Sequence, residues 1–190
     1  EGVVKAVDGV NFEVYQGTTF GLVGESGCGK TTTGRMIMKL IEPTSGSITF
    51  YDDESGKVEI TRLSNGGMRP FRKKIQMVFQ DPYSSLDPRM TIQQIVGEPL
   101  RAMGMDTDDE YKNAIADILK QAGLSPDYMN RYPHAFSGGQ RQRVGIARAL
   151  ITKPQLVVAD EPVSSLDVSV QAQIMNLLKE IKKTLNLTYI

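Results

Sequence analysis

The chain has 190 residues, enough for one domain with a smaller lobe, and its apolar fraction of 40% and charged fraction of 23% are ordinary for a soluble globular protein. Lys and Arg together number 22, as do Asp and Glu, so there is no basic excess to attract nucleic acid non-specifically. No apolar run approaches the roughly 20 residues of a membrane span, and the single cysteine, Cys28, fits a reducing compartment.

Short runs of β-branched and aromatic residues predict strands in the first part of the chain. The run at 19–23 ends in a glycine-rich turn. The runs at 47–51 and 58–61 flank a segment at 52–56 that is typical of a hairpin loop, and the run at 75–79 predicts a further strand.

The apolar spacing becomes helical from about residue 91 to residue 151, with loops at 104–109 and 123–133. A strand is expected at 156–159, and a helix with one apolar face is expected at 170–185. The last residues, 187–190, have the composition of a strand that is beginning. This order of elements predicts an α/β core interrupted by a helical lobe.

A phosphate-binding loop is the first motif that carries chemistry. The sequence GESGCGKT matches the P-loop pattern G-x-x-x-x-G-K-[ST] at every fixed position, directly after the strand expected at 19–23. An amphipathic helix is expected to follow and to stop at Pro43; its apolar residues are Met36, Ile37, Leu40 and Ile41. The residues expected to bind nucleotide are Gly24, Glu25, Ser26, Gly27, Cys28, Gly29, Lys30, Thr31 and Thr32.

The residue types of this loop suit the phosphates of ATP. Glycines let backbone N–H groups approach phosphate oxygens, and the helix that begins here directs the positive end of its dipole at them. Lys30 would place its charge on the β- and γ-phosphates, and the Thr31 hydroxyl is a ligand for Mg²⁺. A dinucleotide-binding loop is disfavoured because Thr32 stands where its third glycine is needed. Cys28 is expected to fill space between two glycines, and a reactive thiol at this helix start is the alternative.

Two adjacent carboxylates, Asp160 and Glu161, follow the strand expected at 156–159. Charged groups at the end of a buried strand are costly unless they hold a cation or take part in chemistry. Successive side chains of a strand point to opposite faces, so the two residues can have different tasks. We expect Asp160 to hold Mg²⁺ through a water, and Glu161 to orient and deprotonate the water that attacks the γ-phosphate. The alternative is a strand end that turns into solvent at Pro162.

A second anion-binding helix start is predicted at 136–140, which reads FSGGQ. A serine of the helix-capping type precedes two glycines that expose backbone N–H groups, and a helix follows. The pentapeptide resembles the signature of ABC transporter ATPases, usually LSGGQ, with Phe136 in place of the leading Leu. The resemblance implies contact with ATP held by a partner subunit; the residues concerned are Ser137, Gly138, Gly139 and Gln140.

Other segments extend this resemblance over nearly the whole chain. Gln80 stands where these ATPases place their Q-loop glutamine, which implies a catalytic and metal-binding role, and Asp167 stands where they place the D-loop aspartate. Four segments are similar to the oligopeptide and dipeptide importers: 6–10, 80–86, 132–134 and 166–173. Within that branch, the segment 139–143 is more similar to the second ATPase subunit than to the first.

Two features of the family fall outside this sequence. The adenine-stacking aromatic residue would precede the segment 6–10, and the switch histidine would follow the strand that begins near Leu187. His134 precedes the signature and cannot replace that histidine; we expect it to pack in a loop. The chain is therefore expected to be a piece of a longer subunit that by itself binds MgATP weakly, stays monomeric and hydrolyses ATP slowly. The segment 51–61 is longer than usual for the family.

The predicted fold is an α/β fold with a RecA-like P-loop core, an N-terminal antiparallel β piece and an inserted helical lobe. Residues 1–80 and 154–190 are expected to form the nucleotide-binding core, and residues 81–153 the lobe that carries the signature. The resemblance implies an ATPase that uses ATP and Mg²⁺ to power solute transport, most specifically peptide uptake. It also implies a head-to-tail dimer with a second ATPase subunit, two membrane permease subunits, an extracytoplasmic solute-binding protein that acts indirectly, no nucleic acid, and a peripheral position at the cytoplasmic face of the cell membrane.

Two other functions stay open on the sequence. A soluble ABC-class ATPase acting on nucleic acid or ribosomes would share these motifs, although the charge balance and the similarity to peptide importers argue against it. A P-loop kinase or GTPase would share the first motif but has no use for a second phosphate-binding helix.

Overall fold

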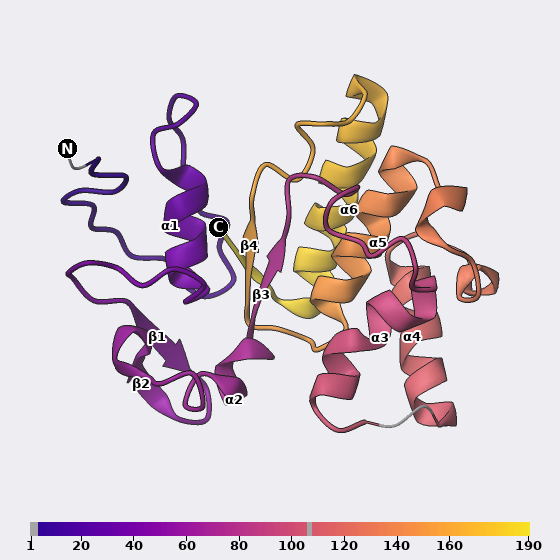
Figure 1. The fold of residues 1–190 in the computed structure, drawn as a ribbon, viewed down its shortest axis with the longest axis horizontal. Helices are drawn as coiled ribbons and strands as arrows, with labels where there is room; N and C mark the ends of the chain where they lie inside the picture. The colour runs from indigo at the N-terminus through magenta and orange to yellow at the C-terminus, as the bar shows by residue number, and fades with distance from the viewer. Residues whose placement is uncertain (1–3, 106–107) are drawn as a thin grey trace.

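The computed structural model describes residues 4–105 and 108–190 (Figure 1). Short 3₁₀ turns at Ile60–Arg62, Pro126–Tyr128 and Pro133–Ala135 join some of the larger elements. In chain order the helices and strands of these residues are α1 (Lys30–Ile37), β1 (Thr49–Asp52), β2 (Gly56–Glu59), α2 (Arg69–Arg72), β3 (Ile75–Val78), α3 (Ile92–Ala102), α4 (Asp109–Gln121), α5 (Gly138–Leu150), β4 (Leu156–Ala159), α6 (Val168–Leu185) and β5 (Thr188–Tyr189).

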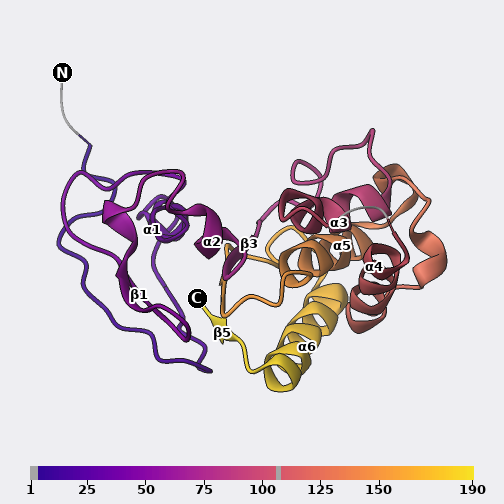
Figure 2. The ribbon, with the colours of Figure 1, turned by 90° about the horizontal axis from the view of Figure 1, so that it is seen from below.

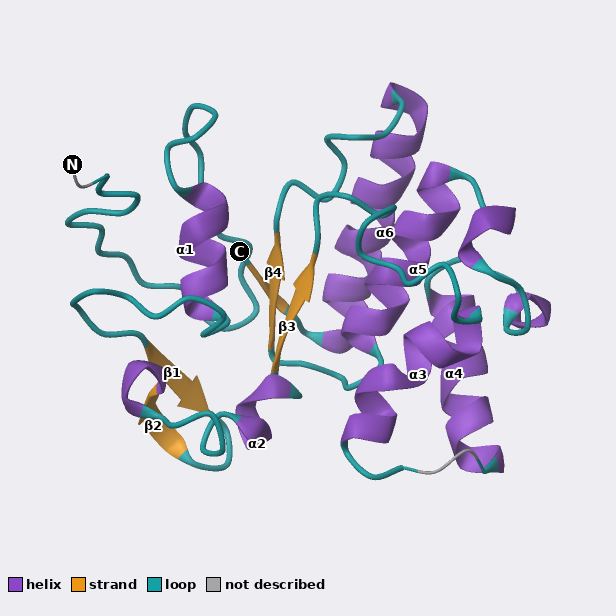
Figure 3. Ribbon diagram, in the orientation of Figure 1, coloured by secondary structure: helices purple, strands orange, loops and turns teal. Residues whose placement is uncertain are grey.

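A parallel sheet with the order β3-β4-β5 separates two layers of structure. β3 and β4 pair from Ile75 opposite Leu156 to Val78 opposite Ala159. Helix α1 and the antiparallel hairpin β1–β2 lie on one side of this sheet, and helices α3 to α6 lie on the other (Figures 1 and 3). A view turned by 90° shows the same division (Figure 2).

The core follows the alternation of side chains along the central strand. Leu156 and Val158 of β4 belong to an apolar cluster with Ile37 of α1, whereas Val157 belongs to the cluster of the helices on the other face. Both faces of a parallel strand are covered in such a fold, which explains why β4 reads as an unbroken apolar run. A Cβ added at Gly34 would lie 3.0 Å from Val158, so α1 packs closely against this strand.

Side-chain caps fix the starts of α3, α4 and α5 on the second face. Thr91 and Gln94 form a reciprocal capping box at α3, and the Asp108 carboxylate accepts from the Tyr111 N–H at α4. α3 and α4 approach closely because Gly97 faces the Tyr111 ring: a Cβ at Gly97 would lie 2.0 Å from the Tyr111 hydroxyl. The helical pattern expected from about 91 to 151 is therefore confirmed, while positions 106–107 of the loop expected at 104–109 lie outside the described residues.

The strand expected at 19–23 is wrong in extent. A parallel bridge joins Thr19 to Tyr189, and the Phe20 N–H donates to the Tyr189 carbonyl at 2.9 Å, but residues 20–23 form no strand. The reason is that β5 comprises Thr188–Tyr189 alone, so it pairs with no more than the first residues of this run.

The helix after the P-loop is shorter than its apolar pattern predicted. α1 ends at Ile37, and Lys39 adopts a φ of 52°. The Lys39 ammonium donates to the carbonyls of Ile60 and Thr61 at 3.2 and 2.9 Å, which turns the chain out of the helix. Leu40 is consequently 58% exposed, so it does not share the apolar face of α1.

The hairpin expected around 52–56 is present as β1–β2, and a buried ion pair anchors it to the sheet. The Lys74 ammonium, just before β3, donates to the fully buried Asp52 carboxylate at 2.7 Å and to the Glu54 carboxylate at 2.6 Å. The Gln155 amide, just before β4, reaches Asp52 at 3.3 Å. The long segment 51–61 is thus tied to the N-terminal ends of both strands, at the edge opposite to the P-loop.

The described helices include none that is both long and apolar enough to cross a membrane. The predicted α/β fold with an antiparallel β piece is confirmed. The boundary of a separate helical lobe at 81–153 stays a prediction, since α3, α4 and α5 share one apolar cluster with α6.

Candidate functional site

The P-loop forms a backbone cradle at the start of α1. Gly27 and Gly29 have φ angles of 81° and 96°, which residues with a side chain rarely adopt. Within the described part of the chain no side chain caps α1, in contrast to α3, α4 and α5, so its first N–H groups are directed into the loop without a side-chain acceptor. Such a helix start favours an anion. Cys28 is exposed, with its sulfur over Gly24, where an added Cβ would lie 2.4 Å away.

Lys30 reaches across this cradle. Its ammonium donates to the carbonyls of Gly24 and Glu25 at 2.8 and 2.9 Å, and it lies 3.9 Å from the Glu161 carboxylate. The cation therefore lies inside the loop, where phosphate oxygens would compete with the two carbonyls for it.

Asp160 and Thr31 meet beside the loop. The Thr31 hydroxyl donates to the Asp160 carboxylate with an oxygen–oxygen distance of 2.9 Å. Neighbouring ligands of an octahedral Mg²⁺ have that spacing when the metal–oxygen distance is about 2.05 Å. No group of three or more His, Cys, Asp or Glu side chains in the described residues could hold a metal by itself. The pair fits Mg²⁺ as an ion that takes one or two protein oxygens and completes its shell with phosphate and water.

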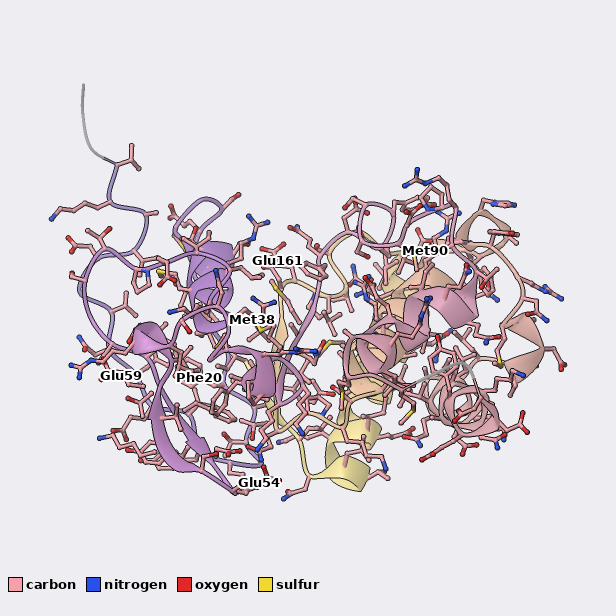
Figure 4. All side chains as sticks on the ribbon, turned by 60° about the horizontal axis from the view of Figure 1, so that its bottom comes forward. Phe20, Met38, Glu54, Glu59, Met90 and Glu161 are labelled. Atoms are coloured by element: carbon pink, nitrogen blue, oxygen red, sulfur yellow. The ribbon has the colours of Figure 1, made fainter. Side chains whose placement is uncertain are left out.

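Glu161 points to different partners from its neighbour. It accepts a hydrogen bond from the Gln80 amide at 2.9 Å, and Gln80 also reaches the Ser164 hydroxyl at 3.2 Å. Its backbone φ is 42°, a left-handed conformation that is uncommon for residues other than glycine and clusters at functional sites. Glu161 lies between α1 and the helical side of the molecule (Figure 4). The carboxyl ends of β3 and β4 thus bring Gln80, Asp160 and Glu161 to the P-loop.

The signature residues are elsewhere in the fold. Ser137 is exposed and caps α5 through a reciprocal capping box with Gln140. Gly138 and Gly139 face α6 and the turn before it, because added Cβ atoms would lie 3.4 Å from Leu166 and 2.5 Å from Val170. Asp167 is the N-cap residue of α6. The signature and the D-loop residue are therefore neighbours, but α1 and the start of α5 lie on opposite sides of the sheet (Figure 1).

Some residues at the site were not singled out from the sequence. Ser164 contacts Gln80 through its hydroxyl, and the Ser165 hydroxyl donates to the Gln80 carbonyl at 3.4 Å. The Ala6 carbonyl packs against Gly29, where an added Cβ would lie 2.2 Å from it. Ser164 and Ser165 come a few residues after Glu161, and this closeness in the sequence is the signal that could have identified them.

The fold and these contacts define a P-loop nucleotide-binding protein of the α/β class, with two carboxylates and a glutamine at the phosphate end. The comparison with protein families narrows this class. The profile described as ABC transporter matches residues 7–164, and the chain belongs to that family.

Curated relatives agree with the predicted branch of the family. The chain is 52% identical over 190 residues to the oligopeptide transport ATP-binding protein AppF of Bacillus subtilis, covering 100% of this chain and 56% of AppF. It is 50% identical to the oligopeptide transport ATP-binding protein OppF of the same organism, covering 100% of this chain and 61% of OppF. It is also 50% identical to the dipeptide transport ATP-binding protein DppF of Lactococcus lactis, covering 100% of this chain and 60% of DppF. The chain thus spans between 56% and 61% of the length of these relatives.

Solved structures confirm the fold. The ATP-binding cassette MJ0796, in a dimeric post-hydrolysis state bound to ADP and Pi, superposes with a TM-score of 0.80 at 32% identity, over 97% of this chain and 78% of that one. The protein cbiO1 of Clostridium perfringens, part of the ABC transporter complex cbiONQ, superposes with a TM-score of 0.79 at 29% identity, over 97% and 70%.

Proposed function

We propose that this chain is the nucleotide-binding part of an ABC importer subunit that hydrolyses ATP to power peptide uptake. The observation that carries the proposal is the pair of contacts on either side of Lys30: Thr31 with Asp160, and Gln80 with Glu161, each at 2.9 Å. Thr31 and Asp160 offer hard oxygen ligands for a metal ion, and Glu161 offers a carboxylate that the Gln80 amide holds in place. Both lie at an uncapped helix start that favours phosphate.

Binding of ATP would begin at the backbone. The N–H groups of the loop and of the first turn of α1 would donate to the β- and γ-phosphates, and the Lys30 ammonium would exchange the carbonyls of Gly24 and Glu25 for phosphate oxygens. Thr31, Asp160 and Gln80 are the residues that would hold Mg²⁺. That ion, when bound, neutralises charge on the β- and γ-phosphates.

Hydrolysis would then be an in-line displacement. Glu161 would accept a proton as the water oxygen bonds to the γ-phosphorus, while the bond from that phosphorus to the bridging oxygen breaks and leaves ADP and inorganic phosphate. Gln80 would hold the Glu161 carboxylate and the water in line. Lys30 would stabilise the charge that develops on the phosphoryl oxygens.

A second subunit would complete the site. The start of α5, which Ser137 caps, lies across the sheet from α1 of the same chain (Figure 1), so the signature residues suit ATP held by a partner in a head-to-tail dimer. The dimeric state of MJ0796 with ADP and Pi supports this arrangement by similarity. The partner is an ATPase subunit of the same kind, and Asp167 would lie near the dimer interface.

Membrane permease subunits are the next proposed partners. A groove of about 530 Å³ lies beside the Gln80 loop, between the end of α1, β3 and α3, and its lining includes Phe79, Ser84 and Glu98. Two permease subunits would dock on this helical side and hold the protein at the cytoplasmic face of the membrane. An extracytoplasmic solute-binding protein would act through the permeases, and no nucleic acid is required.

Glu161→Gln tests the proposal. The amide has the same shape but cannot accept the proton, so turnover should fall on the order of 10²-fold or more while MgATP still raises the melting temperature. Phosphate release and thermal shift measure the two effects, and Glu180→Gln on the exposed face of α6 is the matched control. Wild-type turnover in Glu161→Gln would remove Glu161 as the base. An absence of any MgATP response in the wild-type chain would refute nucleotide binding itself.

A further inference from the structure

Helix α5 holds both ends of the segment that carries Gln80, in addition to the contacts that Gln80 itself makes with the turn after β4. Gln142 is only 2% exposed, and its side-chain amide donates to the Phe79 carbonyl at 3.4 Å. Near the end of the same helix, the Arg148 guanidinium donates to the Ser85 carbonyl at 2.7 Å. These two donors fix the two ends of the segment 79–85, and Gln80 lies between them.

The segment between the two anchors is itself compact. The Asp81 carboxylate accepts from the Tyr83 and Ser84 N–H groups at 2.8 and 3.3 Å, and the Ser85 N–H donates to the Asp81 carbonyl at 3.2 Å. These hydrogen bonds hold the pKa of Asp81 below its ordinary value. A displacement of Ser85 is therefore transmitted to Asp81, the residue next to Gln80, because the turn has little internal freedom.

α5 makes a further contact with this turn from its first helical turn, directly after the signature. The Arg141 guanidinium stacks on the Tyr83 ring with 3.9 Å to the ring centroid, in a cation–π contact. α5 starts at the capping box of Ser137 and is 13 residues long. An uninterrupted helix of this length is stiff, so Arg148 and the signature residues keep a fixed spacing.

The surroundings of the Arg148 side chain favour its hydrogen bond to the Ser85 carbonyl. The side chain is half-buried, lies 5.8 Å from the Phe79 ring centroid and lines the groove beside Glu98. Burial lowers its pKa and the charge of Glu98 opposes this effect, but a guanidinium keeps its charge in proteins. A half-buried charged donor holds its acceptor more strongly than a neutral one does.

We propose that Arg148 and Gln142 are positioning residues for Gln80, because they hold both ends of the segment 79–85 that carries it against α5. The consequence for catalysis rests on the proposed function, in which Gln80 acts at the ATP of its own P-loop. Arg148 acts through Ser85 and touches no reacting atom.

Hydrogen exchange and steady-state kinetics on the same variants test this proposal. Arg148→Ala removes the donor to Ser85, and the amides of residues 83–86 should then exchange on the order of tenfold faster. Arg148→Lys keeps a cationic donor and should restore part of the protection. Arg143→Ala is the matched control, because Arg143 lies on the same helix but donates to the Ala122 carbonyl at 2.9 Å, away from the loop.

Kinetics separate positioning from general loss of structure. In Arg148→Ala, KM for MgATP should stay within about twofold since Lys30, Thr31 and Asp160 are untouched, while kcat should fall roughly 10- to 100-fold because Gln80 is misplaced. Gln142→Met, which keeps the side-chain length without the donor, should lower kcat in the same direction and covers the case in which Arg148→Ala fails to fold.

The outcomes are distinguishable. Equal exchange in Arg148→Ala and Arg143→Ala overturns the anchoring of the loop by α5. Faster exchange with unchanged kcat overturns the positioning role. If the wild-type chain neither binds nor hydrolyses MgATP, the proposed function fails, while the exchange experiment still decides whether α5 holds the loop.

Discussion

Replacement of Gly139 by alanine separates packing from nucleotide contact in the signature. An added Cβ would lie 2.5 Å from the Val170 methyl group on α6, far inside van der Waals contact. The same change at Gly138 would place a Cβ 3.4 Å from Leu166, which is an ordinary contact. Gly138→Ala is therefore a matched control in the same helical turn.

The expected magnitude follows from two opposing terms. Overpacking of this kind costs about 1–3 kcal/mol, and alanine is favoured over glycine in a helix by up to about 1 kcal/mol. The net destabilisation of Gly139→Ala is then about 1–2 kcal/mol, or roughly 2–8 °C in melting temperature for a domain of this size. Val170→Ala removes the opposing methyl group, so the double variant should be as stable as Val170→Ala alone.

Melting temperature and phosphate release are measured on the wild type and on these four variants. The Cβ at Gly139 points at α6, which leaves the N–H groups of the helix start accessible, so turnover should recover in Gly139→Ala/Val170→Ala together with stability. A double variant that regains the stability of Val170→Ala but stays inactive would refute this reasoning and place the requirement for glycine at the nucleotide.

Lys30→Ala should abolish the MgATP-induced rise in melting temperature while the apo protein keeps its fold, because the Lys30 ammonium bonds to loop carbonyls and not to the core; wild-type ATP affinity in this variant would contradict the role of the loop. Ser137→Arg should impair turnover in the dimer but leave ATP binding by the monomer unchanged, at a stability cost of about 1 kcal/mol for the lost cap, and mixed dimers would locate the defect. Asp52→Asn should lower the melting temperature at neutral pH. The hydrogen bond from Lys74 outweighs burial and holds the pKa of Asp52 well below its usual range, so the stabilisation is present above about pH 4 and is lost as pH falls towards the folded-state pKa. The difference from the asparagine variant should therefore shrink between pH 5 and pH 2 in thermal melts, and a difference independent of pH would contradict the assignment.

Local patterns in the sequence were enough to predict much of this molecule. The apolar run at 156–159 predicted a buried strand, and the structure assigns Val157 and Val158 to different apolar clusters on its two faces. Capping residue types predicted the start of α5 at Ser137. Thr31 and Asp160 were each named as Mg²⁺ ligands from the sequence, and the structure brings the two side chains to within 2.9 Å of each other.

Long-range hydrogen bonds were beyond such reasoning. The end of α1 depends on Lys39 reaching carbonyls some 20 residues away, and no periodicity signals that contact. The left-handed backbone of Glu161 is likewise not signalled by its residue type. The hydrogen bond from Arg148 to the Ser85 carbonyl joins residues that are 63 positions apart, and no local sequence pattern around either residue predicts it.

The alternating burial along β4 has a consequence for the chemistry at its end. If β4 slipped by one residue against β3, Val157 and Val158 would exchange apolar clusters, and the residues beyond them would shift by about 3.3 Å and change faces. Glu161 would then stand beside Thr31, and the carboxylate intended for the water would meet the metal ligand. The methyl groups of Val157 and Val158 therefore determine which of the two acids lies beside Thr31.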